Sequence, residues 1–446
     1  MKTGRRPIVM VSALVLFVLV SCGGGSKPSS DSEARTAENN VDALGIPIDP
    51  SKVNTELKGE ISWWVWGDYE IRGTQDFNKY YPNVTINFVA VPSDEFPEKV
   101  LTAFATGIDL PDVINIESAE RGQFNNMDVW ERLDAAPYNF NKNDVLPIDI
   151  PLISNSKGEI VCSQIDNCVS GYMYDRNLAK KYFGTDDPAE MEKLFASIDD
   201  FIEKSKVVAA GGDYMFASPE DVVDCIGNLF KEPHTIGTKL NTDNTILPTY
   251  RVIEKLVANK AIGPYTMWTP TWMTSFSSNK VLFYIGPAWF FSYTVKPADP
   301  DSTGKWGLIT PPGDGFNRGG TAYAIPKKAK NKDLAWEAIK WFTMTMEGSR
   351  SFFQAHNATT MYNPAYDTDL FKGEPDPYFG GQNWVAKLNE IAVLPGTSAP
   401  VMGPFDFHIR RVNDQVLPDL VSGKSADETY TKFISLLLER APELSR

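Results

Sequence analysis

An aromatic ring and a carboxylate stand close together near residue 66. Trp66 ends the apolar run EISWWVW over Glu60–Trp66, and Asp68 follows after a single glycine. A flat aromatic face packs against apolar C–H surface, while a short carboxylate accepts hydrogen bonds from hydroxyl groups. The pair therefore suits a ligand with an apolar face and a rim of hydroxyls, as a sugar has. The alternative is that these tryptophans are core residues, and strand alternation places Trp63 on the face opposite Trp64 and Trp66.

Two further carboxylates lie where a strand or a turn is expected to end. Glu117 directly follows the predicted strand 111–116, and Asp166 stands beside Asn167 in the loop VCSQIDNCV. Ligands of α/β folds collect outside the carboxyl ends of parallel strands, so we expect Glu117 to face a ligand. A disulfide between Cys162 and Cys168 would hold Asp166 toward the same ligand. Each also has a structural alternative, a helix-start carboxylate for Glu117 and a solvated turn for Asp166.

A second group of aromatic residues is predicted to line the same ligand site. Trp289 follows Gly286-Pro287, where a buried strand is expected to end and a helix to begin, because proline suits the first helical turn. Trp268 and Trp272 lie in TMWTPTWMTSF, a loop flanked by threonine and proline. We predict that these three rings contact the ligand.

A glycine pair, Gly319-Gly320, marks a predicted hinge. It lies between the strands expected at 305–311 and 323–326 and lets the backbone bend without steric cost. Backbone N–H groups at such a bend can reach a ligand. The candidate contacts here are Gly320, Thr321 and Tyr323.

These residues need a scaffold, and the apolar pattern predicts alternating strands and helices. Alternation of this kind implies parallel strands joined by crossover helices, hence an α/β fold. The expected strands are 60–66, 84–90 and 111–116, with helices at 70–81 and 96–107 between them.

The chain is long enough for two domains. Residues 158–161 and 169–174 are expected to pair around the loop that holds Cys162 and Cys168, and the mostly helical region 188–281 predicts a second lobe. An oxidising exterior favours a disulfide between these two cysteines, whereas the alternative is free thiols throughout. The remaining cysteine, Cys225, is expected to be buried.

The N-terminus has the pattern of a secreted lipoprotein. Basic residues precede the apolar stretch 8–20, which is too short to span a bilayer. Residues 19–22, Leu-Val-Ser-Cys, match the bacterial lipobox, so we predict a signal peptide over 1–21 and lipid attachment at Cys22. The alternative is an ordinary signal peptide. The small, polar residues 22–57 predict a flexible tether.

Composition and motifs argue against several functions. A net charge of −14 without a basic stripe disfavours nucleic acid and anionic lipid as partners. The three histidines are far apart and no HExxH motif occurs, so we expect no metal and no cofactor. The segment SGKS at 422–425 lacks the first P-loop glycine, since Pro418 occupies its place. No GxSxG motif occurs either, and we therefore expect no enzyme.

Four segments between residues 286 and 342 carry a resemblance to a known family. In order they read GPAWF, KWGLITPPG, GGTAYAIPK and NKDLAWEAIKWF, and they resemble the extracellular solute-binding proteins of sugar ABC transporters, in the maltose/oligosaccharide group. The resemblance implies a two-lobed periplasmic-binding-protein fold of type II, with each lobe a sheet flanked by helices and hinge strands joining them. It implies that Trp289 stacks on sugar, although Ala288 stands where the family often has tryptophan. Phe405, in GPFDFHIRR, resembles the family's last aromatic contact.

We therefore expect a monomeric, lipid-anchored solute-binding protein of the cell envelope, on the outer side of the cytoplasmic membrane or in the periplasm. It would capture a sugar or oligosaccharide between two lobes and deliver it to ABC permease subunits by hinge closure. The expected lobes are 58–175 with 322–380 and 176–321 with 381–446. Alternatives are a polyol, glycerol-phosphate diester or peptide ligand, a binder without a permease, or a surface glycoside hydrolase. Few candidate contacts are Arg or Lys, which disfavours phosphate.

Overall fold

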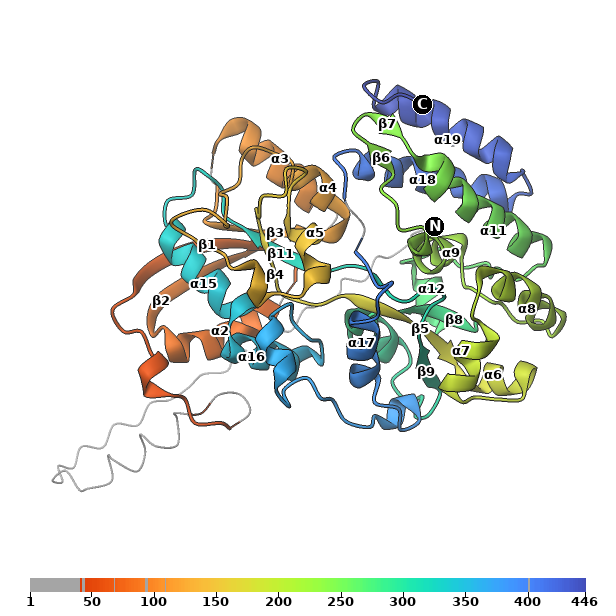
Figure 1. Cartoon of the computed structure of the whole chain (residues 1–446), viewed down its shortest axis with the longest axis horizontal. Coiled ribbons are helices and arrows are strands. Elements are labelled where there is room, and N and C mark those ends of the chain that lie inside the picture. The colour runs from red at the N-terminus through yellow and green to blue at the C-terminus, as the bar shows by residue number, and fades with distance from the viewer. Residues whose placement is uncertain (1–40, 42–44, 68, 93–94, 109, 400–401) are drawn as a thin grey trace, which may run out of the picture. The chain divides into compact units, whose positions relative to one another are not determined.

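The computed structural model describes residues 41, 45–67, 69–92, 95–108, 110–399 and 402–446. The strands of its first sheet are β1 (Lys58–Val65), β2 (Asn83–Ala90), β3 (Val113–Glu117), β4 (Ser163–Gln164) and β11 (Thr321–Ala324). Their order is β2-β1-β3-β11-β4 (Figure 1). β1 pairs in parallel with β2 and β3, whereas β11 runs antiparallel to β3 and β4. The parallel strands and the helices between them confirm the predicted α/β fold.

Helices of the first sheet are held by aromatic packing. β3 is buried from Val113 to Ile116, as expected for a strand that is covered on both faces. α2 (Tyr69–Tyr80) contacts β2, and α15 (Lys332–Met344) contacts β1. Phe77 of α2 stacks on Phe342 of α15, with ring centroids 5.8 Å apart. The helix that connects β1 to β2 is therefore fixed against a helix from the second half of the chain.

The second sheet is antiparallel about a central strand. Its strands are β5 (Val169–Asp175), β8 (Phe283–Gly286), β9 (Trp306–Ile309) and β10 (Phe316–Asn317). β5 is buried along its whole length and pairs with each of the other three. Helices around this sheet are α6 (Arg176–Phe183), α7 (Pro188–Leu194), α8 (Ile198–Ala210), α9 (Pro219–Cys225), α11 (Leu247–Ala258), α12 (Pro270–Ser275), α17 (Trp384–Ala392), α18 (Asp406–Val421) and α19 (Ala426–Arg440). Figure 1 shows α11, α18 and α19 packed together, in agreement with their mutual contacts.

The buried apolar residues form two clusters. The first core contains residues from the first sheet with α2 and α15, and the second core contains β5, β8 and β9 with α11, α18 and α19. Because β5 lies in the second sheet, the chain has changed sheets by residue 169. The expected lobe boundaries stay predictions.

The cysteine loop differs from the expected hairpin. β4 belongs to the first sheet and β5 to the second, so residues 165–168 join the two sheets instead of turning back on themselves. Residues 318–320 make the return crossing beside them. Ile165 N–H donates to the Thr321 carbonyl (3.0 Å), and Arg318 N–H donates to the Cys168 carbonyl (2.9 Å). We call these two antiparallel segments, 163–170 and 316–323, the crossing strands.

The predicted Cys162–Cys168 disulfide is not formed in the structure. Both thiols are free and buried, as is that of Cys225. Cys168 Sγ donates to Asp166 Oδ2 (3.0 Å), whereas Cys162 Sγ lies 3.7 Å from Asn125 Oδ1 within the first core. The chain between them continues from one sheet toward the other, so the two side chains find separate partners.

Candidate ligand-binding site

Two strand ends and one strand start meet at one edge of the first sheet. Trp63 and Trp64 of β1 pair with Val113 and Ile114 of β3, so both parallel strands end at this edge. Glu117, the last residue of β3, pairs with Thr321, the first residue of β11. The predicted carboxyl-end arrangement of these strands is therefore present.

Trp66 stands directly after β1 at this edge. It is half-buried, and its ring packs edge-on against Phe96, with centroids 5.1 Å apart and planes at 88°. One part of the indole is thus held by the first core while another remains exposed. Asp68, its predicted partner, lies outside the described residues, as does Cys22.

Glu117 begins a short 3-10 helix, η2 (Ser118–Glu120). Its Oε1 accepts from Ser118 Oγ (2.6 Å) and its Oε2 accepts from Ala119 N–H (2.7 Å). The helix-start alternative therefore accounts for both of these contacts. Burial opposes the charge, but the hydrogen bonds and the positive charges of Arg410 and Arg318 outweigh it and lower the pKa of Glu117.

A second carboxyl lies beside Glu117. Burial, then the neighbouring charge of Glu117 and a hydrogen bond to it, raises the pKa of Glu120. The two side chains thus form a carboxyl pair, and their oxygens can accept hydrogen bonds from hydroxyl groups. Sequence reasoning missed Glu120, Arg318 and Arg410. Arg410 lies little more than one helical turn after Phe405, which was itself a predicted contact. This spacing could have pointed to Arg410 as a second contact.

The exposed aromatic surface comes from Trp268 and Trp289. Trp268 is 55% exposed, and its ring plane lies 24° from that of Trp289, with centroids 6.3 Å apart. Trp268 also has a positive φ of 63°, an unusual backbone conformation for a bulky side chain. Trp289, on α13 (Ala288–Phe290), is half-buried. These two rings offer a flat apolar face, and their contact with a ligand stays a prediction.

Two other predicted contacts are core residues. Trp272 has no exposed surface, and its indole N–H donates to Asp221 Oδ2 (3.0 Å). Tyr323 is also fully buried, with its ring edge-on to Trp63 at 4.8 Å. Neither side chain presents a face to a ligand in this structure, because each fills the interior of one core.

The remaining hinge candidates are occupied by contacts within the crossing strands. Asp166 Oδ1 accepts from Thr321 N–H (3.0 Å), and the Thr321 hydroxyl hydrogen-bonds that of Tyr69. The Gly320 carbonyl accepts from Arg121 Nη2 (2.8 Å). Asp166 is therefore not a solvated turn residue. It ties one crossing strand to the other.

Phe405 lies at the start of α18, half-buried against the second core. The nearby Gly403 backbone rests on Gly122 of α4 (Arg121–Phe124), where an added Cβ would lie 2.2 Å from the Gly403 oxygen. This contact carries the α18 segment, with Arg410, toward Glu117. The structure thus brings Phe405 to the neighbourhood of the strand ends.

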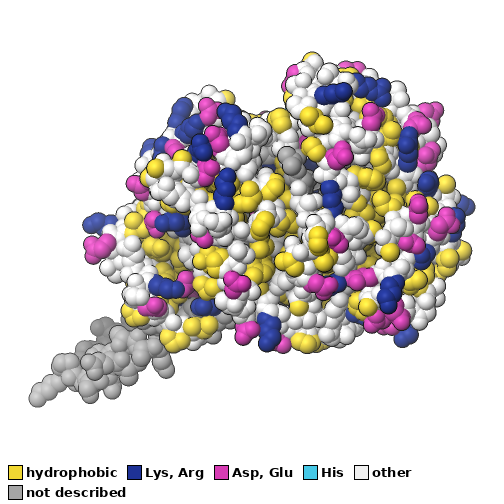
Figure 2. Space-filling view, in the orientation of Figure 1, with side chains coloured by type: hydrophobic (Ala, Val, Ile, Leu, Met, Phe, Trp, Pro, Cys, Tyr) yellow, Lys and Arg dark blue, Asp and Glu magenta, His cyan; other side chains and the backbone are white. Residues whose placement is uncertain are grey.

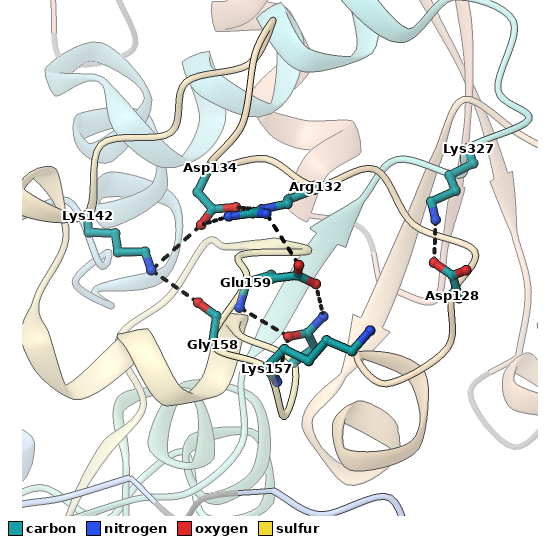
Figure 3. Close-up of polar contacts among 9 residues, drawn as sticks. Asp128, Arg132, Asp134, Lys142, Lys157, Gly158, Glu159 and Lys327 are labelled. Atoms are coloured by element: carbon teal, nitrogen blue, oxygen red, sulfur yellow. Dashed lines mark hydrogen bonds and ion pairs between the residues drawn. The ribbon is translucent and has the colours of Figure 1, made fainter.

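Basic side chains elsewhere on the first core are paired with acids. Figure 3 shows Arg132 between Asp134 and Glu159, with Nε–Oδ1 and Nη1–Oε1 distances of 2.8 and 3.3 Å. Lys327 forms an ion pair with Asp128 in the same view. Across the face in Figure 2, Lys and Arg are interspersed with Asp and Glu. These side chains do not form a continuous positive surface.

A cavity of about 610 Å³ lies against α16 (Met346–His356). Its lining includes Met346 and Phe353 on one face of the helix and residues 368–370. None of the predicted ligand contacts that the structure describes is among the lining residues. Within the described ranges, no group of histidine, cysteine and acidic side chains could hold a metal ion, and no helix could cross a bilayer.

A family model of bacterial extracellular solute-binding proteins matches residues 74–376, more than half of the chain. The chain therefore belongs to the bacterial extracellular solute-binding protein family, and the resemblance seen in the sequence is confirmed. Membership of a family of binding proteins supports binding over catalysis and an extracellular location. A comparison with curated proteins found no match.

Solved structures share this fold at low sequence identity. An extracellular solute-binding protein of family 1 has a TM-score of 0.76 at 18% identity, covering 85% of this chain and 99% of its own. The GacH receptor of Streptomyces glaucescens, solved unliganded and with acarbose, has a TM-score of 0.68 at 18% identity, covering 87% and 100%. The galacto-N-biose/lacto-N-biose I-binding protein of a Bifidobacterium longum ABC transporter, solved with lacto-N-biose, has a TM-score of 0.69 at 15% identity, covering 87% and 98%. These likenesses confirm the predicted periplasmic-binding-protein fold.

Proposed function

We propose that this protein is the lipid-anchored binding component of an ABC importer and captures a sugar or oligosaccharide between its two lobes. The anchor would be the acylated Cys22, followed by the tether 22–57. The folded body would hand its ligand to permease subunits at the membrane. Structural neighbours solved with acarbose or lacto-N-biose support a sugar as the ligand class.

The observation that carries the proposal is an exposed aromatic pair and a carboxyl pair that both lie near Arg318. Trp268 and Trp289 supply flat apolar faces, Trp289 donates to the Arg318 carbonyl, and the Arg318 charge acts on Glu117. Sugars require this combination, because each ring has an apolar C–H face and hydroxyls that both donate and accept. Trp66 adds a third half-exposed ring at the edge of the first sheet.

Hinge closure would complete the site. The crossing strands are the natural pivot, because they run side by side and join the two sheets. A ligand that contacts both lobes stabilises the closed state only as far as it binds that state better than the open one. A ligand that contacts the aromatic pair of one lobe and the strand ends of the other would bind the closed state more tightly than the open one.

A phosphorylated or acidic solute is the second candidate. Few cations are found among the residues that the sequence predicts as contacts, but Arg318 and Arg410 both lie close enough to Glu117 to lower its pKa. Asp224 offsets one of these charges by pairing with Arg318 (2.9 Å). The ligand panel should therefore include glycerol-phosphate diesters and sugar acids beside neutral sugars.

The test is thermal unfolding of the chain without residues 1–21 against this panel. A ligand at about 100 times its dissociation constant should stabilise the protein by about 2.7 kcal/mol. Trp268→Ala and Trp289→Ala should remove the ligand-induced shift while leaving a folded protein. Trp272→Ala serves as the contrast, since loss of this buried ring should lower the unfolding free energy by about 3–5 kcal/mol without ligand.

Peptides complete the panel. A thermal shift produced only by peptides or by glycerol-phosphate diesters would be compatible with the fold and would reject a sugar as the ligand. An unchanged sugar response in both exposed tryptophan variants would reject the proposed site. Lipid attachment is a separate question, tested by radiolabelled palmitate incorporation that Cys22→Ser should abolish.

A further inference from the structure

Trp289 is tied to the returning crossing strand, 29 residues further along the chain. Its indole Nε1–H donates to the Arg318 carbonyl at 2.8 Å. Gly319, the next residue, is buried with φ of +100°, and a Cβ added there would lie 2.5 Å from Trp289 Nε1. The edge of the indole therefore rests on backbone that only glycine leaves open.

Arg318 is itself held on two sides, so the acceptor for the indole is fixed. Its N–H donates to the Cys168 carbonyl of the other crossing strand (2.9 Å). Its guanidinium makes two hydrogen bonds to the Asp224 carboxylate of α9, at 2.9 and 3.0 Å. A paired guanidinium–carboxylate contact restricts orientation as well as distance. The Arg318 carbonyl thus points at Trp289 from a backbone anchored to both the hinge and the second core.

We propose that Arg318 and Gly319 are positioning residues that set the plane of Trp289 beside the predicted hinge. The positioning of Trp289 is independent of the proposed function. Only the statement that Trp289 contacts the ligand rests on it. The Arg318 carbonyl fixes one edge of the indole, and the absence of a Cβ at Gly319 leaves room for that edge. Loss of either feature would release the plane of the ring.

The first experiment needs no ligand. We would follow exchange of the Trp289 indole proton with solvent by NMR of ¹⁵N-labelled protein, assigning the signal by its loss in Trp289→Phe. Gly319→Ala should speed this exchange at least about tenfold, the effect expected for loss of one hydrogen bond. Gly320→Ala is the matched control, because φ there is +109° but the added Cβ would meet the Gln164 side chain instead of Trp289.

Unchanged exchange in a folded Gly319→Ala protein would overturn the inference, and so would equal acceleration in Gly320→Ala. Asp224→Asn gives a second route if Gly319→Ala does not fold. It weakens the hold on Arg318 without adding a side chain, and it should also speed exchange of the Trp289 proton. Unchanged exchange in that variant would likewise count against the inference.

The second experiment measures ligand affinity in a double-mutant cycle with maltose as the probe. Gly319→Ala should weaken binding about tenfold in the wild-type background and much less in Trp289→Phe, because the donor is already gone. Equal losses in both backgrounds would mean that Gly319 acts only on general stability. If maltose does not bind at all, the exchange experiment still decides the positioning role, and the affinity cycle is run with the sugar that gives the largest thermal shift in the panel.

Discussion

At the scale of single residues, the buried acid Glu70 is expected to make the stability of the protein depend on pH. It has no exposed surface, and its Oε1 accepts from Asn115 Nδ2 (2.8 Å), whose Oδ1 accepts from Trp63 Nε1–H (2.7 Å). This chain of hydrogen bonds links α2, β3 and β1. Burial raises the pKa of Glu70 to about 7, so the folded protein prefers the neutral acid.

This preference makes stability depend on pH. Because the folded-state pKa of Glu70 lies above its usual 4.5, the folded state binds more protons, and the unfolding free energy falls as pH rises from about 4.5 to 7. Glu70→Gln removes the titration and keeps the acceptor. Its stability relative to the wild type should rise across that range by about 3 kcal/mol, measured by urea unfolding at several pH values. A constant difference between the two proteins would contradict a raised pKa at this residue.

At the scale of elements, the crossing strands explain the state of the cysteines. Cys168 lies on one crossing strand and hydrogen-bonds Asp166, whose other oxygen holds Thr321 N–H on the second strand. A disulfide to Cys162 would draw this thiol away from that arrangement. Cys162 instead lies in the first core, near the Ile153 carbonyl.

We therefore predict that the folded protein carries free thiols at Cys162, Cys168 and Cys225. Its thermal midpoint should be the same with and without dithiothreitol, whereas loss of a native disulfide would typically lower stability by about 2–4 kcal/mol. After unfolding without reductant, maleimide should label all three cysteines. Peptide mass spectrometry that found Cys162 joined to Cys168 would contradict the structure.

At the scale of the whole fold, the two cores touch at places other than the crossing strands. The Gly403 backbone rests on Gly122 of α4, leaving no space for a side chain. The Tyr293 hydroxyl hydrogen-bonds His356 of α16, and the Tyr69 ring lies against both. These contacts hold the segments of Gly403 and Tyr293, which adjoin the second core, against α4 and α16.

Gly122→Ala tests the first of these contacts. Its Cβ would displace the Gly403 segment, so we expect a loss of about 1–3 kcal/mol in stability and a larger radius of gyration in solution scattering. Gly227→Ala is the control, because its Cβ would meet nothing closer than 3.5 Å and its φ is not positive. If Gly122→Ala behaves like Gly227→Ala, the contact does not hold the two parts together.

The sequence by itself determined the α/β fold and the family. Apolar alternation and turn residues act over a few positions, so β1, β3 and the helices between them could be predicted without knowing their neighbours. The segments GPAWF and KWGLITPPG are short stretches of sequence, so their resemblance to the family could also be recognised without the tertiary structure. The predicted hinge at Gly319-Gly320 also follows from local backbone freedom.

Only the tertiary structure decided which candidate side chains face outward. Trp268 and Trp272 are four residues apart in one motif, yet one is exposed and the other is sealed in the core beside Asp221. The approach of Arg318 and Arg410 to Glu117 joins residues about 200 and 290 positions apart. Exposure and such pairings depend on which distant elements pack together, and local periodicity does not contain that information.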